Sequence, residues 1–171
     1  MGSARPEFMK IELKQRILLA CAVMLTLTPS VGAAQTYDPG SGFSASLNPA
    51  GVWQYGYSLT LGSPLILHAA ADSSQGFPVW RTDLGSGVPS IGYNPTAGDI
   101  SFGTLTVGPY EMVLHPGPND EIALLRFTAP FAGQYHVTGT FLGRDISGPT
   151  TAVHVLTNGT LILMSRIVDS G

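Results

Sequence analysis

The chain has 171 residues, a formal net charge of −3 and a single cysteine, Cys21. Residues 35–171 contain no Lys, and four Arg stand against nine Asp and Glu, a net charge of −5 with His neutral. Nucleic acids and anionic membrane surfaces bind basic patches, so this acidic surface argues against both as partners. This part of the chain also has no cysteine for a disulfide, and it is long enough for one domain but too short for two.

Two N-terminal segments are separate from the fold. Residues 1–8 lack apolar periodicity and precede a second Met, so we interpret them as an expression tag or a misassigned start. Residues 9–34 have the three parts of a secretory signal, with basic residues first, an apolar run at 17–27 and small residues before a predicted cleavage after Ala34. The basic residues are Lys10, Lys14 and Arg16.

The apolar run of this signal is shorter than the roughly 20 residues that a membrane span needs. We therefore predict cleavage, no membrane span in the mature chain, and a secreted, periplasmic or cell-surface location.

After a lead-in at residues 35–47, clusters of Gly, Pro, Asn and Ser alternate with short runs rich in aromatic and β-branched residues. One run, 135–141, places Tyr135, Val137 and Phe141 on one face, and Asn158-Gly159 is typical of a tight hairpin turn. The expected strands are 53–61, 64–70, 79–83, 100–107, 110–114, 121–128, 135–141, 152–156 and 160–168. The pattern predicts an all-β domain over residues 48–171, an antiparallel β-sandwich. The segment 68–72 is compatible with a helix but is too short to count as one.

A resemblance is carried by Phe127-Thr128-Ala129-Pro130, Gly133, Tyr135, Val137, Val153, Val155 and Asn158-Gly159. This half of the chain resembles C1q-like and tumour-necrosis-factor-like jelly rolls. Two further motifs, Asn48-Pro49-Ala50-Gly51-Val52-Trp53-Gln54-Tyr55-Gly56-Tyr57 and His115-Pro116-Gly117-Pro118-Asn119, make residues 48–167 similar to exported bacterial β-sandwich domains of PEP-CTERM-type secreted proteins.

The resemblance implies a jelly roll that lacks its last strand or strands. The alternatives are a truncated chain and a sheet that another chain completes through an open edge. The sorting tail of the PEP-CTERM type is not found in this sequence.

Aromatic side chains suggest a binding face. Trp53, Tyr55 and Tyr57 share one face of an expected strand, and Trp80 follows on a later one. Such faces stack on sugar rings in carbohydrate-binding sandwiches, although the same alternation more often builds a core, especially at Trp53. The candidate glycan contacts are Trp80, Tyr93, Asn119 and Asp120.

The loop 115–121 has the densest polar chemistry. Its end carries Asn119, Asp120 and Glu121, and hard oxygen ligands of this kind could hold Ca²⁺ through Asp120 and Glu121. The loop lacks the spaced carboxylates of a dedicated calcium motif, so a site would need further ligands from elsewhere in the chain, such as Asp99, Glu111 or Asp145. A turn whose Asn and Asp bond their own backbone is the favoured alternative.

Catalytic motifs are not found. The His-x-His spacing of metal-binding cupins is absent, although His136 and His154 fall on neighbouring expected strands and could form a cross-strand pair. No nucleophile elbow, phosphate loop or mature cysteine nucleophile is present.

We therefore expect a non-catalytic exported binding module with a polysaccharide or cell-surface glycan as its partner and no cofactor other than Ca²⁺. The alternatives are an assembly module that forms protein–protein contacts, including homo-oligomers, and a metal-dependent jelly-roll enzyme.

Overall fold

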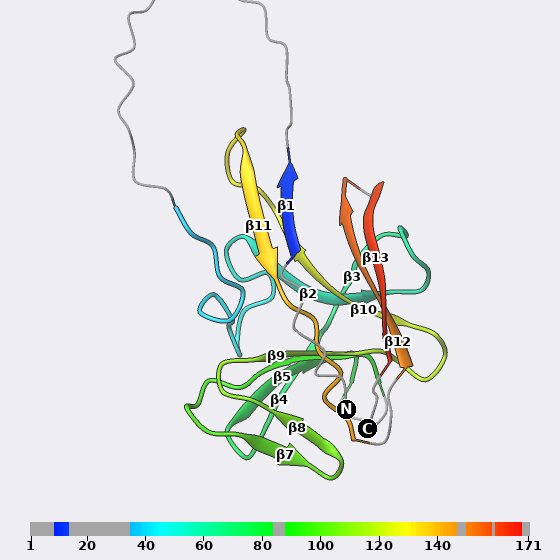
Figure 1. Ribbon diagram of the computed structural model, residues 1–171. Helices are drawn as coiled ribbons and strands as arrows, with labels where there is room; N and C mark the ends of the chain where they lie inside the picture. The colour runs from blue at the N-terminus through cyan, green and yellow to red at the C-terminus, as the bar shows by residue number, and fades with distance from the viewer. Residues whose placement is uncertain (1–8, 14–34, 84–87, 147–149, 159, 169–171) are drawn as a thin grey trace, which may run out of the picture. The chain divides into compact units, whose positions relative to one another are not determined.

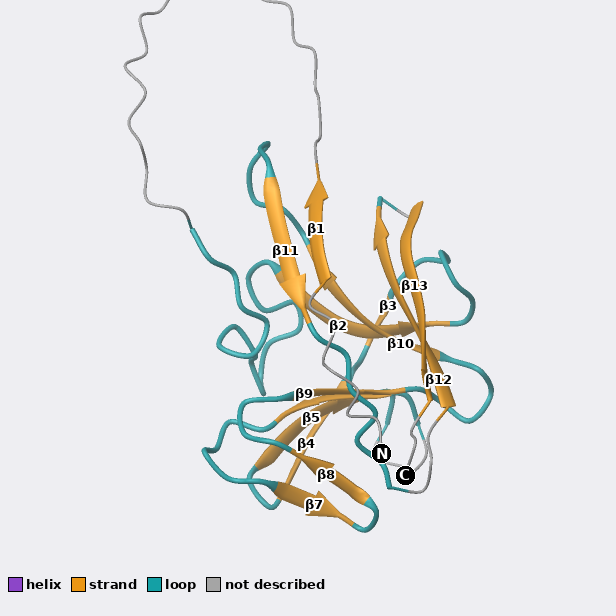
Figure 2. Cartoon of the chain, viewed as in Figure 1, coloured by secondary structure: helices purple, strands orange, loops and turns teal. Residues whose placement is uncertain are grey.

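The computed structural model describes residues 9–13, 35–83, 88–146, 150–158 and 160–168 (Figure 1). All regular secondary structure in these residues is strand, and the strands pair antiparallel, which confirms the predicted all-β class (Figure 2). The jelly-roll order of the strands stays a prediction. Within the described part of the chain, no helix is long and apolar enough to cross a membrane.

The strands, in chain order, are β1 (Met9–Leu13), β2 (Trp53–Ser58), β3 (Ile66–Leu67), β4 (Ala70–Ser74), β5 (Phe77–Arg81), β6 (Ser90–Tyr93), β7 (Ile100–Phe102), β8 (Leu105–Val107), β9 (Met112–His115), β10 (Ile122–Phe127), β11 (Tyr135–Gly139), β12 (Thr150–Thr157) and β13 (Thr160–Val168).

The chain divides into two compact units, and the first comprises residues 1–37 and 131–140. Its strands β1 and β11 pair from Met9 opposite Gly139 to Leu13 opposite Tyr135. Since β1 belongs to the predicted signal segment, cleavage after Ala34 would remove the strand that pairs with β11. Residues 1–8 and 14–34, with the predicted cleavage site, lie outside the described residues.

The second unit comprises residues 38–130 and 141–171, so the predicted sandwich domain falls in it except for 131–140. It contains a three-stranded sheet in the order β10-β2-β3 and a four-stranded sheet in the order β4-β5-β6-β9. Tyr55 of the first sheet packs with Trp80 and Ile91 of the second, and all three are buried. Because successive strand residues point to opposite faces, Trp80 and Ile91, which lie opposite each other, share this inter-sheet face.

The other face of the four-stranded sheet is also covered. Phe77 and Val79 of β5 pack with Ile100 of β7 and Val107 of β8. Both faces of β5 are therefore apolar, which explains the unbroken run Phe77-Pro78-Val79-Trp80 in the sequence.

The strand predictions differ from the structure at several places, among them β1, which lies in the predicted signal segment, and the expected strand 64–70, of which β3 covers only Ile66–Leu67. The expected strand 100–107 is a hairpin, because Gly103 adopts φ +60° and turns the chain between β7 and β8. The helix-compatible segment 68–72 contributes to β4, whose partner β5 fixes it as strand. β6 was not expected, since its four residues Ser-Ile-Gly-Tyr hold only two large apolar side chains.

The C-terminal hairpin agrees with its prediction. β12 pairs with β13 from Thr150 opposite Val168 to Thr157 opposite Thr160. Asn158 adopts φ +50°, as a tight turn requires, while Gly159 lies outside the described residues.

We expect Gly92→Ala to destabilise the second unit. A Cβ at residue 92 would lie 2.2 Å from Cε1 of Phe77, whose ring also packs against Phe102 at a centroid distance of 5.3 Å. The clash should lower the free energy of unfolding by about 1–3 kcal/mol in urea titration. Gly98→Ala is the control, because a Cβ there meets nothing within 4 Å, and it should change stability by less than about 0.5 kcal/mol. Equal effects of the two substitutions would contradict the packing of Phe77 over Gly92.

Candidate functional site

Four aliphatic side chains with large exposed fractions lie on β3 and on the segment that joins β2 to β3. Their exposed fractions are 62% for Leu59, 43% for Leu61, 41% for Ile66 and 39% for Leu67. We call these four residues the apolar edge, because β3 is the last strand of its sheet. Single exposed leucines are common on protein surfaces, whereas several exposed apolar side chains along one sheet edge are a candidate contact surface.

The turn between β2 and β3 is closed by its own hydrogen bonds. The Ser63 amide donates to the carbonyl of Thr60 at 3.1 Å, and the Ser63 hydroxyl donates to the same carbonyl at 2.9 Å. Gly62 adopts φ +81° at the third turn position, the geometry of a type II turn. The turn thus holds Leu61 at its tip with the side chain outward.

Asn48 anchors β3 to β2. Its Nδ2 donates to the carbonyl of Tyr55 at 2.7 Å and to that of His68 at 3.0 Å, and its Oδ1 accepts the Tyr55 amide at 3.0 Å. Residues 48–50 return along β2 through mutual bonds between Ala50 and Trp53. β10 pairs along one edge of β2. Residues 48–50 and β3 lie one after the other along the opposite edge of β2, where the side-chain amide of Asn48 joins them.

His68 closes the buried end of this edge. Its side chain is 2% exposed, neither ring nitrogen has a hydrogen-bond partner, and its ring stacks on Tyr57 at a centroid distance of 5.6 Å. Burial lowers the pKa of His68 from 6.5 to about 4, because the charged form would lose its hydration. The imidazole is therefore neutral at pH 7 and packs as an aromatic ring.

The predicted glycan contacts Trp80 and Tyr93 lie on the two inner strands of the four-stranded sheet. Trp80 is 7% exposed, and its indole N–H donates to the Ser44 carbonyl at 2.6 Å. A sugar ring stacks on an aromatic face that is open to solvent, and the buried indole offers none. Tyr93 is half-buried, with its ring 5.9 Å from that of Phe43.

The other two predicted contacts, Asn119 and Asp120, are exposed and lie in the loop after β9. β9 runs antiparallel to β6, with Met112 opposite Tyr93 and His115 opposite Ser90. The loop thus leaves the sheet about 10 Å of strand away from Tyr93. Tyr93 and the start of this loop thus lie at different ends of the β6–β9 pairing.

The loop 115–121 is stabilised by the backbone and carboxylate of Glu121. The Asn119 amide donates to Glu121 Oε2 at 2.9 Å, its Nδ2 donates to Oε1 at 3.1 Å, and the Gly117 amide donates to the Glu121 carbonyl at 2.9 Å. The bonds from Asn119 lower the pKa of Glu121. In the described residues no three His, Cys, Asp or Glu side chains gather as a metal site would require, so Ca²⁺ binding at Asp120 and Glu121 stays a prediction.

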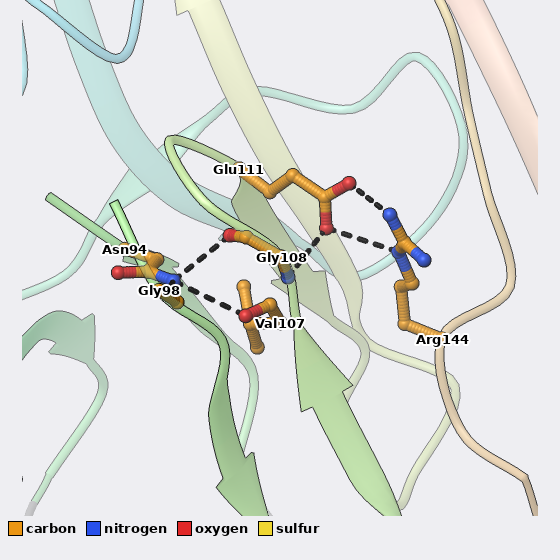
Figure 3. A network of polar contacts seen from close by, with 6 residues as sticks. All are labelled: Asn94, Gly98, Val107, Gly108, Glu111 and Arg144. Atoms are coloured by element: carbon orange, nitrogen blue, oxygen red, sulfur yellow. Dashed lines mark hydrogen bonds and ion pairs between the residues drawn. The ribbon is translucent and has the colours of Figure 1, made fainter. Parts of the chain in front are cut away.

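A second side-chain amide organises the loops beside β8. Asn94 is fully buried, and its Nδ2 donates to the carbonyls of Gly98, Val107 and Gly108 at 2.8, 3.1 and 2.9 Å (Figure 3). The carboxylate of Glu111 accepts the Gly108 amide at 2.8 Å and pairs with Arg144. This network joins loop segments, and it engages the carboxylate of Glu111, one of the distant candidate ligands for Ca²⁺.

His136 and His154, weighed as a possible cross-strand pair, lie on strands that have other partners. β11, which carries His136, pairs with β1, whereas β12, which carries His154, pairs with β13. The two strands belong to different sheets, so strand pairing does not place these side chains opposite each other.

The apolar edge was missed by sequence reasoning, which placed its residues inside two expected strands. The signal that could have found it is charge, since no Asp, Glu, Lys or Arg occurs between Asp38 and Asp72. Leucines in a turn within such a segment have no charged neighbours in sequence to cover them.

In comparisons with protein-family models, curated proteins and solved structures, no match to this chain was found. The resemblance to exported bacterial jelly rolls and to C1q-like domains therefore stays a prediction.

We expect Asn48→Ala to destabilise the second unit by about 1–3 kcal/mol in urea titration. The substitution removes three hydrogen bonds and leaves the amide of the buried Tyr55 without an acceptor. Asn119→Ala is the control, because its bonds lie in an exposed loop, and it should cost less than about 1 kcal/mol. A cost for Asn48→Ala no larger than that of the control would contradict the anchoring role.

We expect His68 to make stability fall between pH 6.5 and pH 4. The unfolded state binds a proton near pH 6.5, whereas folded His68 binds one only near pH 4, so stability is full above this window and is lost as the pH drops through it. The loss should be about 2–3 kcal/mol. His68→Phe keeps a ring against Tyr57 and should remove this slope in urea titrations at several pH values, whereas His115→Phe at an exposed position should retain it. A slope that persists in His68→Phe would contradict the assignment.

Proposed function

We propose that the mature chain is a non-catalytic, exported module that works by protein–protein assembly at or outside the cell surface. The observation that carries this proposal is the apolar edge, where four exposed aliphatic side chains flank the outermost strand of a sheet. Burial of such side chains against a partner is favourable by about 25 cal/mol per Å². An edge strand adds backbone groups that can extend the sheet into the partner.

The segment that supports export is residues 9–34, whose basic, apolar and small-residue parts are those of a secretory signal. The net charge of −5 beyond it favours a protein partner over nucleic acid or an anionic membrane.

Glycan binding, the other function that the sequence suggested, has less support. It relied on Trp80, whose ring is buried, and on contacts that the fold separates along β6 and β9. The apolar edge has no aromatic or charged member with which to stack on or orient a sugar.

The proposal is tested by site-specific photo-crosslinking in the cells that export the chain. A benzophenone amino acid in place of Leu61, at the tip of the turn, should yield a covalent adduct of higher mass with a protein. The same amino acid in place of Ala97, in an exposed loop of the second unit, should yield none. This chemistry suits the chain because residues 35–171 have no Lys for amine-reactive reagents.

An adduct at residue 61 that matches one at residue 97, or no adduct at residue 61, would overturn the proposal. Affinity electrophoresis in gels that contain xylan or hydroxyethylcellulose distinguishes glycan binding from protein assembly. Assembly through the apolar edge predicts unchanged mobility, and a retardation that Leu61→Ser leaves intact would favour the glycan instead.

A further inference from the structure

We propose that the partner at the apolar edge is a second copy of this chain, whose β3 pairs antiparallel with the first β3 across a two-fold axis. The proposal rests on the assembly function above and identifies its partner. The sheet β10-β2-β3 would then continue into β3-β2-β10 of the second copy.

The backbone of β3 has the register that this pairing needs. The His68 amide donates to the Tyr55 carbonyl at 3.1 Å, so the peptide groups of His68 face β2. Peptide groups alternate in direction along a strand, and those of Leu67 therefore point away from β2, toward the open side of the sheet. This open side is where a strand of a partner would bond.

Two identical antiparallel edges satisfy each other. A two-fold axis through the contact places each Leu67 peptide group beside the other β3 and brings the apolar edges of both copies together. The contact closes after two copies, because each copy has used its β3, and so it forms a dimer rather than a fibre. β3 has only two residues, so the leucines rather than backbone bonds must provide most of the affinity.

Charge favours self-association at this edge over other parts of the surface. Two mature chains, each with a net charge of −5, repel one another. The segment between Asp38 and Asp72 contains β2, β3 and the turn, and it has no charged side chain. The strand β3 and its turn therefore bring no like charges of their own into the contact.

The edge lacks several of the features that keep edge strands apart. It has no Lys or inward-pointing charge, and β2 and β3 pair without a bulge, although β3 itself is short. Pro64 lies before β3 and not within it, so both residues of β3 keep a backbone N–H.

The test is a charge exchange at Leu67, followed by light scattering of the purified chain at about 100 µM, where contacts of micromolar affinity are populated. The wild-type chain should have twice the monomer mass. Leu67→Lys and Leu67→Glu should each weaken self-association by about 100-fold, because the two-fold axis sets like charges against each other. A mixture of the two variants should recover the dimer mass, which only a contact between copies can produce.

Leu161→Lys is the matched control, since Leu161 of β13 is a strand leucine that is 43% exposed, close to the 39% of Leu67. It should leave the dimer mass unchanged, and circular dichroism should show the same strand content for all variants.

A monomeric wild-type chain, or variants that remain dimeric, would overturn self-pairing. The photo-crosslinking adduct separates this failure from a failure of the assembly function. An adduct of twice the chain mass supports both proposals, whereas an adduct of any other mass with a monomeric purified chain overturns self-pairing and leaves assembly with another protein.

Discussion

The arrangement of the candidate surface depends on the side-chain amide of Asn48. β2 and β3 pair over only two residue pairs, Gly56 with Leu67 and Tyr57 with Ile66, which is too short a ladder to hold a strand by itself. The amide of Asn48 takes the place of the next backbone bond, because it satisfies the amide and carbonyl of Tyr55 and the carbonyl of His68 together. The position of β3 is held because three part-buried hydrogen bonds join Asn48 to both strands of this junction.

Asn94 has the same bridging role elsewhere in the unit. Its buried amide joins the loop at Gly98 to the end of β8 at Val107 and Gly108, and Glu111 and Arg144 extend the network to the surface. Residues 35–171 have no disulfide and few charges, so buried amides with several backbone partners supply the cross-links between irregular segments. A side-chain amide can do this because it has both donors and an acceptor in one plane.

The core and the apolar edge are thus two parts of one pattern. Trp53, Tyr55 and Tyr57 alternate toward the inner face of their sheet, and Tyr55 and Trp53 pack there with Trp80. The chain then leaves this face at Ser58, and the leucines that follow have no second sheet to cover them. The proposed assembly would bury this exposed apolar surface against a partner.

The sequence by itself determined the class of the fold, because alternation with a period of two and dense turn residues are local properties. They predicted the strand pairs at 152–168, the core role of Trp53 and the hairpin at Asn158. They could not show that Gly103 divides one expected strand into two, nor that Trp80 is enclosed, since both depend on which strands become neighbours. Likewise, only the tertiary structure decided that β3 is an edge strand, that Asn48 anchors it and that four aliphatic side chains remain exposed beside it. The physical reason is that burial and strand order are set by contacts between residues far apart in sequence, such as Tyr55 with Trp80 and Asn48 with His68.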